Sequence, residues 1–269
     1  MSAAASHRQI AARLPGSLEV RLLGTVDFDA AIALQERVAY ELSGRRDTNG
    51  VLVLCEHPPV ISIGREGSRS QVLATEEQLA AAGSPVRWVS RSGGAVVHVP
   101  GQLAAYLLLP LDRLMMAPGE YRRRFEEALL GVCHDLRVPA KRLDDGPGLW
   151  TRGGQIGHFG AVVKSWVTQQ GMWLNVAPEA SWLRLVRSEL AGIPRPIGGT
   201  VPASPRTARG VVEERVTSLQ QQLSCRVFMH AARDSALRHI AESFGYDTVH
   251  TFTGHPALYR QRRRVLISV

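Results

Sequence analysis

The amino-acid sequence predicts an α+β fold rather than a doubly wound parallel sheet. Apolar strand-like runs and segments with helical periodicity both occur, but they do not alternate regularly along the chain. The composition, 45% hydrophobic and 21% charged, is that of an ordinary globular protein. A length of 269 residues allows one large domain or two small ones.

The first half of the chain supplies strands and three helices. Asp27 is a candidate N-cap for a helix over residues 30–42, and Thr75 with Gln78 fits a capping box that opens a helix ending near Gly83. A longer amphipathic helix is expected over residues 120–136. Strands are expected over residues 18–26, 51–55, 86–89, 95–98 and 103–109.

The second half begins with a predicted hairpin and continues into a long loop. Residues 155–163 and 167–176 form the two strands of the hairpin, and residues 191–210 are rich in Pro, Gly, Ser and Thr. An irregular loop of this length in a compact domain is either functional or disordered. Two helices are expected over 211–223 and 227–244, followed by a basic tail over 247–269 that ends in a strand-like run.

Composition excludes several classes of protein. No run reaches the roughly 18 apolar residues that a membrane helix needs, and the N-terminus lacks the apolar core of a signal peptide. The three cysteines form no CxxC pair, so we expect neither a disulfide framework nor a metal site, and we expect a cytoplasmic protein. The net charge of +8 reflects arginine usage or an acidic partner; few aromatic residues lie among the arginines, so nucleic acid is not the expected partner.

Three segments could carry chemistry. Residues 91–102 (RSGGAVVHVPGQ) and 153–160 (GGQIGHFG) hold glycines that let a ligand approach the backbone, and Arg91 can bind a carboxylate or phosphate. In residues 171–176, Met172 and Trp173 could line an apolar tunnel. The alternative for all three is structural: tight turns, a β-bulge, and histidine and tryptophan side chains satisfied within the core.

Five motifs in order resemble the lipoyl(octanoyl) transferase family. Residues 54–65 (LCEHPPVISIGR) resemble its LEHPPVYTLGR segment, and residues 91–103 resemble RGGxxTYHGPGQL. Residues 154–160 resemble GKIAxxG, residues 167–176 resemble VTYHGLALNV, and residues 215–219 resemble GVTSL. The order and spacing match over roughly residues 18–225.

The resemblance implies the fold of biotin and lipoate protein ligases, with a mixed sheet flanked by helices and no cofactor or metal. It implies transfer of an octanoyl group from acyl carrier protein to a lysine of a lipoyl domain, with acyl carrier protein, lipoyl domains and an octanoyl or lipoyl group as partners. It also implies a substrate-binding set in the glycine-rich and hairpin segments. In this sequence the set is Arg91, Ser92, Gly93, Gly94, Ala95, Val96, Val97, His98, His158, Phe159, Gly160, Gly171, Met172 and Trp173.

Departures from the family pattern cluster at the implied catalytic residues. The family lysine that opens KIA is Gln155 here, and the family cysteine, counted back from VTSL, is Arg209. Neither can replace its counterpart, because glutamine is uncharged and arginine is no nucleophile. Lys164 is expected at the surface and Cys55 in the core, so neither is expected to substitute.

These observations leave three hypotheses open. The chain is an acyltransferase of protein lipoylation, impaired in cysteine and lysine chemistry; or it is a non-catalytic homologue that binds an acyl group, acyl carrier protein or a lipoyl domain. The third, an ATP-using ligase, would need a lysine where Gln155 stands. The expected organisation is an N-terminal extension (1–17), a transferase-like domain (18–225, with the loop at 191–210) and a C-terminal helix with a basic tail (226–269).

Overall fold

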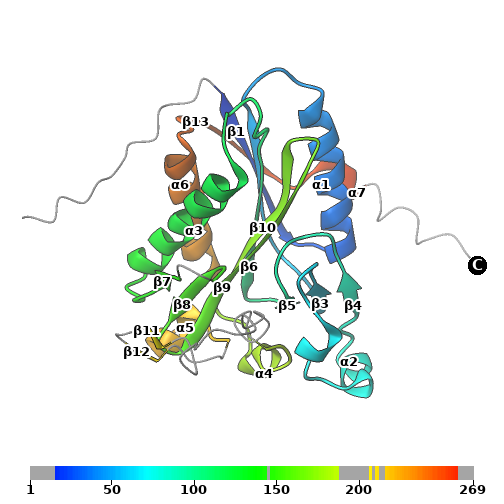
Figure 1. Ribbon diagram of the computed structural model, residues 1–269, viewed down its shortest axis with the longest axis vertical. Coiled ribbons are helices and arrows are strands. Elements are labelled where there is room, and N and C mark those ends of the chain that lie inside the picture. Colours follow the sequence, from blue (N-terminus) through cyan, green and yellow to red (C-terminus); the bar gives the residue numbers. More distant parts are fainter. Residues whose placement is uncertain (1–15, 144–145, 188–205, 208–209, 212–215, 260–269) are drawn as a thin grey trace, which may run out of the picture.

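A mixed β-sheet forms the centre of the molecule (Figure 1). The computed structural model describes residues 16–143, 146–187, 206–207, 210–211 and 216–259. Within these residues the main sheet has eight strands in the order β13-β1-β2-β6-β10-β9-β8-β7. β1 pairs in parallel with both β13 and β2, and the other pairs are antiparallel. The strands are β1 (Ser17–Thr25), β2 (Gly50–Glu56), β6 (Gln102–Leu108), β7 (Lys141–Arg142), β8 (Leu149–Thr151), β9 (Gly154–Lys164), β10 (Val167–Asn175) and β13 (Thr248–Thr253).

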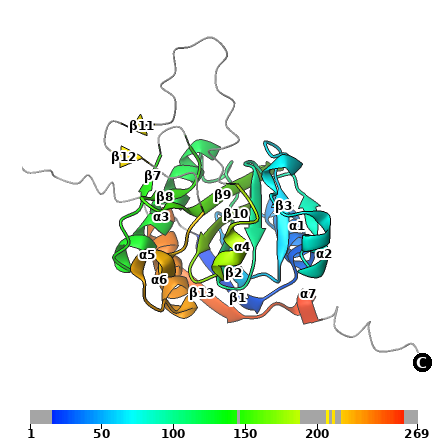
Figure 2. The same cartoon turned by 90° about the horizontal axis from the view of Figure 1, so that it is seen from below.

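Helices cover both faces of this sheet (Figures 1 and 2). α3 (Pro118–Asp135) and α6 (Met229–Phe244) pack together on one face, over a core that includes Phe125 and Phe244. α1 (Phe28–Ser43) covers the other face, over a core that includes Tyr106 and Trp173. The α+β fold with a mixed sheet flanked by helices is therefore confirmed.

A second, smaller sheet lies on the α1 side of the molecule (Figure 2). β3 (Val60–Ile63) is its central strand, parallel to β4 (Val86–Trp88) and antiparallel to β5 (Ala95–His98). The short helices η1 (Arg69–Gln71), α2 (Glu76–Ala81) and α4 (Ala180–Leu183) belong to this part of the chain, whose own core includes Ile61 and Leu79.

Helices α1 and α2 begin at the capping residues that the sequence predicts. Asp27 accepts a hydrogen bond from Ala30 N (2.9 Å) at the start of α1. Thr75 and Gln78 form the reciprocal capping box of α2: Gln78 N donates to Thr75 Oγ1 (3.2 Å), and Thr75 N donates to Gln78 Oε1 (2.9 Å). Both predictions are confirmed, and the strands predicted at 18–26, 51–55, 86–89, 95–98 and 103–109 are present with small shifts of their ends.

The helix predicted over residues 211–223 is wrong. Among the described residues of this range, which leave out 212–215, only α5 (Leu219–Leu223) is helical, and Gly210–Val211 is the strand β12, paired with β11 (Arg206–Thr207). Val216 instead forms a parallel bridge with Gln155, so a tertiary contact decides its extended backbone. The predicted loop over 191–210 lies mostly outside the described residues.

The last part of the chain joins the same sheet and core. α6 packs on α3, β13 pairs with β1 from Ser17↔Thr248 to Leu22↔Thr253, and α7 (Pro256–Tyr259) follows. The described part of the chain has no helix with the length and apolar character that crossing a membrane requires.

Candidate functional site

The two glycine-rich segments predicted from the sequence lie in contact. Ser92 N donates to Ala161 O (3.0 Å), and Ala161 N donates to Ser92 Oγ (3.2 Å), which joins the loop before β5 to β9. A Cβ placed on Gly160 would lie 2.8 Å from both Arg91 Cδ and Ser92 O. Gly160 is therefore required for this close approach.

Arg91 is fully buried at this junction and organises the loop around it. Its Nη2 donates to Ser62 O (3.0 Å), Ser62 Oγ (2.8 Å) and Gly94 O (3.0 Å), and its Nη1 donates to Ser92 O (2.9 Å). The guanidinium lies over the ring of Trp173, 5.1 Å from the ring centroid. The amino groups of Arg91 thus hold oxygen atoms of the protein itself, and its role as an anion ligand stays a prediction.

Aromatic side chains of α1, of the main sheet and of the segment after β2 pack around His98. Its ring stacks on Phe28 at 4.8 Å and meets Trp173 edge-on at 5.1 Å. The neighbouring His57 donates from Nδ1 to Val26 O (2.7 Å) and accepts from the Tyr106 hydroxyl at Nε2 (2.6 Å). Burial lowers the pKa of His57 to about 4, so this histidine is neutral at pH 7.

The hydrogen bonds around His98 have one consistent direction. Because Arg91 donates to Ser62 Oγ, the Ser62 hydroxyl donates in turn to His98 Nε2 (2.7 Å). The proton of His98 is then on Nδ1, which donates to Gln102 Oε1 (3.2 Å). Burial, then the neighbouring His57 and Arg91, hold the pKa of His98 well below its usual value. His98 is therefore a neutral member of a satisfied network.

This network continues to the segment after residue 215. Gln102 Nε2 donates to Asn175 Oδ1 (2.9 Å), and Asn175 Nδ2 donates to Thr217 O (2.9 Å). Thr217 N donates to Gln155 O (2.8 Å). Strands β6, β9 and β10 are thereby linked to the segment that carries the fifth sequence motif.

Gln155 is fully buried at the position where the family resemblance implies a lysine. Its Nε2 donates to Gly157 O (3.3 Å) and lies 3.1 Å from where a Cβ on Gly148 would stand. The neighbouring His158 is also buried, and burial together with Arg91 lowers its pKa to about 3. These groups are neutral, so the cationic charge of the junction comes from Arg91.

Not all of the predicted binding residues face this junction. Met172 and Phe159 lie opposite each other on β10 and β9, in the core beneath α3 and α6. His158 and Trp173 form the next opposed pair, and Trp173 belongs to the core beneath α1. Val96 belongs to the core beneath α1, whereas Ala95 and Val97 belong to the core of the small sheet.

No buried thiol of the chain is poised to ionise. Cys55 Sγ lies 3.7 Å from His57 Nε2, but burial raises the pKa of this thiol far above its usual value. Burial also raises the pKa of Cys133, to about 12. Cys225, the third cysteine, is exposed. Lys164 is exposed as well, and its Nζ lies 3.6 Å from Glu36 Oε1.

Ser62, Gln102 and Asn175 were not among the predicted site residues. Each stands inside one of the quoted motifs: Ser62 in EHPPVISIGR, Gln102 in PGQL and Asn175 in LNV. Polar residues within otherwise apolar strands were the available signal, because a buried polar side chain needs a hydrogen-bonding partner. Arg209 lies outside the described residues.

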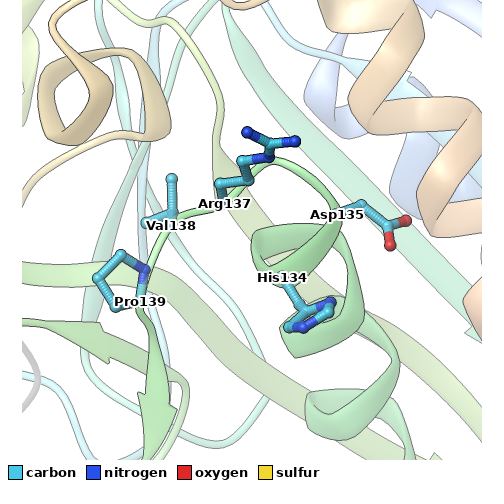
Figure 3. A pocket seen from close by; sticks show the side chains of 5 residues that line it. All are labelled: His134, Asp135, Arg137, Val138 and Pro139. Atoms are coloured by element: carbon cyan, nitrogen blue, oxygen red, sulfur yellow. The ribbon is translucent and has the colours of Figure 1, made fainter.

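A surface pocket lies elsewhere, at the C-terminal end of α3 (Figure 3). Asp135 in this pocket binds α6: its Oδ2 accepts from Ser235 Oγ (2.5 Å), Arg238 Nη2 (2.6 Å) and His239 Nε2 (2.9 Å). These bonds, the one from Ser235 first, lower the pKa of Asp135 to about 2. The carboxylate is thus used for helix packing. Among the described residues no group of three His, Cys, Asp or Glu side chains could hold a metal ion.

Comparisons with known proteins agree on one family. The family model of the lipoyl protein ligase A/B catalytic domain matches residues 27–241. An octanoyltransferase of Geobacter metallireducens is 35% identical over 191 residues, which is 66% of this chain and 86% of that protein. An octanoyltransferase of Geotalea uraniireducens is 36% identical over 173 residues, 64% of this chain and 77% of that protein.

The fold comparison gives a similar result. A bi-partite lipoate protein ligase from Thermoplasma acidophilum aligns with a TM-score of 0.62 over 92% of each chain, at 15% sequence identity. At this identity the likeness concerns the fold alone. It agrees with the mixed sheet and its flanking helices.

Proposed function

Because this chain belongs to the lipoyl protein ligase A/B catalytic-domain family, and its relatives include octanoyltransferases, we propose that it transfers an octanoyl group from acyl carrier protein to a lysine of a lipoyl domain. One observation supports this proposal most directly. Segments far apart in the sequence meet at Arg91: the loop before β5, Gly160 on β9 and Trp173 on β10. The same segments carry the resemblance to the octanoyltransferase family.

The proposed reaction forms an amide and breaks a thioester. The ε-amine of the acceptor lysine attacks the octanoyl carbonyl, the C–N bond forms, the C–S bond breaks, and the carrier's thiol leaves with a proton. Arg91, Ser62 and His98 would hold the loop beside the acyl group, since their hydrogen bonds fix the position of residues 91–94.

A second candidate function is acyl binding without transfer, and Gln155 favours it. A buried neutral amide cannot lower the pKa of a nucleophile by Coulomb attraction, as a lysine at this position would. The buried thiols of Cys55 and Cys133 do not replace the missing nucleophile, because burial raises the pKa of each.

An acidic carrier as the acyl donor is supported by the charge near the loop. Arg65 and Arg187 are exposed, and both attach to the site through their backbones: Arg65 N donates to Arg91 O (2.9 Å), and Arg187 N donates to Gln71 O (2.9 Å). Gln71 Oε1 in turn accepts from Ala95 N (3.0 Å) at the end of the glycine loop. Together with the net charge of +8, these arginines favour an acidic partner.

The test is incubation of the chain with octanoyl-acyl carrier protein and a lipoyl domain, followed by intact mass spectrometry of each protein. An octanoyl adduct on the lipoyl domain that depends on the chain supports transfer. Octanoate binding by calorimetry without any adduct supports the second candidate, and absence of both rejects the two proposals.

The double variant Gln155→Lys with Arg209→Cys tests the chemistry separately. If the family's residues fit this scaffold, the variant should gain an octanoyl adduct on its own chain. The single variant Gln155→Lys is the matched control, because it restores the cation without the thiol.

A further inference from the structure

A buried carboxylate on α3 binds the turn that leads into β8. Glu126 is fully buried, and its Oε1 accepts from Arg122 Nε (2.9 Å) and Gly148 N (2.9 Å). Its Oε2 accepts from Arg142 Nε (2.7 Å) at the end of β7. Two arginines and one backbone amide thus meet at a single carboxylate.

The same arginine holds the turn at a second point. Arg122 Nη2 donates to Gly146 O (2.6 Å), and its guanidinium lies over the Phe159 ring of β9, 5.7 Å from the centroid. Gly146 and Gly148 are therefore both bonded to adjacent turns of α3. We call Glu126, Arg122 and Arg142 the α3 clamp.

Gly148 places the turn directly against the predicted site. A Cβ on Gly148 would lie 2.1 Å from Gly157 O and 3.1 Å from Gln155 Nε2, so the backbone here touches β9. Its φ of +80° is in the left-handed region that favours glycine. Any shift of this turn would change the space around Gln155.

The turn has a further bond from the fully buried Trp150, whose Nε1 donates to Pro147 O (3.0 Å). β7 and β8 contain two and three residues, at the edge of the sheet. Short edge strands contribute few ladder bonds, whereas α3 is anchored in the main core by Tyr121, Phe125 and Leu129. Buried ion pairs add little net stability, and their best-supported use is to select one arrangement.

We propose that Glu126 is a positioning residue: through the α3 clamp it sets the distance of Gly148 from Gln155 and Gly157, and so the shape of the acyl site. The role in acyl binding rests on the proposed function. The role in holding the turn stands on the contacts of Glu126 alone.

The test compares Glu126→Gln with Glu120→Gln in the full chain. Glu120 is the matched control, because it also lies on α3, pairs with Arg124 four positions away at 2.6 Å, and is 37% exposed. Glu127 is unsuitable, because its Oε1 lies 3.7 Å from Arg142 of the clamp. Two quantities are measured: amide hydrogen exchange of residues 148–157 without ligand, and the Kd for octanoate by calorimetry. Removal of a charge-assisted hydrogen bond should raise the exchange rate and the Kd by about tenfold or more in Glu126→Gln only.

The two measurements test separate parts of the proposal. If amide hydrogen exchange of residues 148–157 in Glu126→Gln equals that of the wild type, or rises equally across α3, Glu126 does not hold the turn. Faster exchange at 148–157 with an unchanged octanoate Kd overturns its role in acyl binding. If the wild-type protein binds no octanoate, the proposed function is contradicted. The hydrogen-exchange measurement still tests whether Glu126 holds the turn. If Glu126→Gln does not fold, Arg142→Gln replaces it with the same expectation, since Arg142 is 30% exposed.

Discussion

Replacing Arg91 with methionine should lower the free energy of unfolding by about 3–5 kcal/mol. Methionine has a similar length but no donor, so four hydrogen bonds to Ser62, Ser92 and Gly94 are lost. Bonds from charged donors contribute roughly 1.5–3 kcal/mol each, but bonds made by one side chain do not add independently. The estimate is therefore set below their sum.

The size of this effect can be judged against an exposed arginine. Arg87 also makes two hydrogen bonds, to the Asp29 carboxylate at 3.0 and 3.2 Å, but it is 42% exposed. Exposed pairs contribute about 0–1 kcal/mol, so Arg87→Met should change stability by no more than that. Burial and the number of hydrogen bonds, four for Arg91 and two for Arg87, separate the two variants.

The assay is urea unfolding followed by tryptophan fluorescence and by circular dichroism. For a chain of this size, a loss of about 4 kcal/mol corresponds to a fall in Tm of about 8–16 °C, which differential scanning calorimetry can check. If the free energies of unfolding of Arg91→Met and Arg87→Met differ by less than about 1 kcal/mol, the hydrogen bonds of Arg91 do not hold the loop. The argument for a positioning role of Arg91 then fails.

Three further outcomes are expected. The pKa values in the folded chain, about 4 for His57 and about 3 for His158, lie below the ordinary value of 6.5. As the pH falls, the unfolded chain therefore binds protons before the folded chain does. The free energy of unfolding should be constant above about pH 7 and should fall below pH 6.5, by up to about 1.4 kcal/mol per pH unit for each histidine. A flat profile in urea unfolding between pH 7.5 and 4.5 would contradict this. Gly171→Ala should lower the free energy of unfolding by about 3 kcal/mol, because its Cβ would lie 2.3 Å from the Ala105 carbonyl oxygen. Gly119→Ala should raise the free energy of unfolding by about 0.5–1 kcal/mol, because the space around Gly119 in α3 is open. Equal melting temperatures of the two variants would refute this contrast. Alkylation of the folded chain should modify one thiol, Cys225, and mass mapping that finds either buried cysteine modified first would overturn that expectation.

Local signals in the sequence predicted most of the elements correctly. The N-cap at Asp27 and the capping box at Thr75 are short-range devices, so their residues specify them without the rest of the fold. The apolar run at 51–55 predicted the buried strand β2 for the same reason. The helix predicted over 211–223 failed because residue 216 is paired with Gln155, some sixty positions earlier, and no local pattern contains that contact.

The candidate site was predictable in its segments but not in its contacts. The glycines at 94 and 160 indicated close approach, which Gly160 makes against Arg91. The sequence could not show that the Arg91 guanidinium turns inward to Ser62 and Gly94, because an arginine beside glycines is equally suited to binding an anion. Glu126 gave no signal, since Glu–Arg spacing on a helix is typical of a solvated face.

The pairing of β13 with β1 has a consequence for synthesis on the ribosome. The first strand of the sheet takes its outer partner from residues 248–253, so the backbone groups along that edge of β1 have no strand beside them while most of the chain is being made. Contacts between such distant positions form slowly, and an open strand edge during that time invites pairing with other nascent chains. The last strand therefore covers this edge of β1 only late in synthesis. It is mostly exposed, adds little to the core, and takes the edge position of the sheet in place of β1.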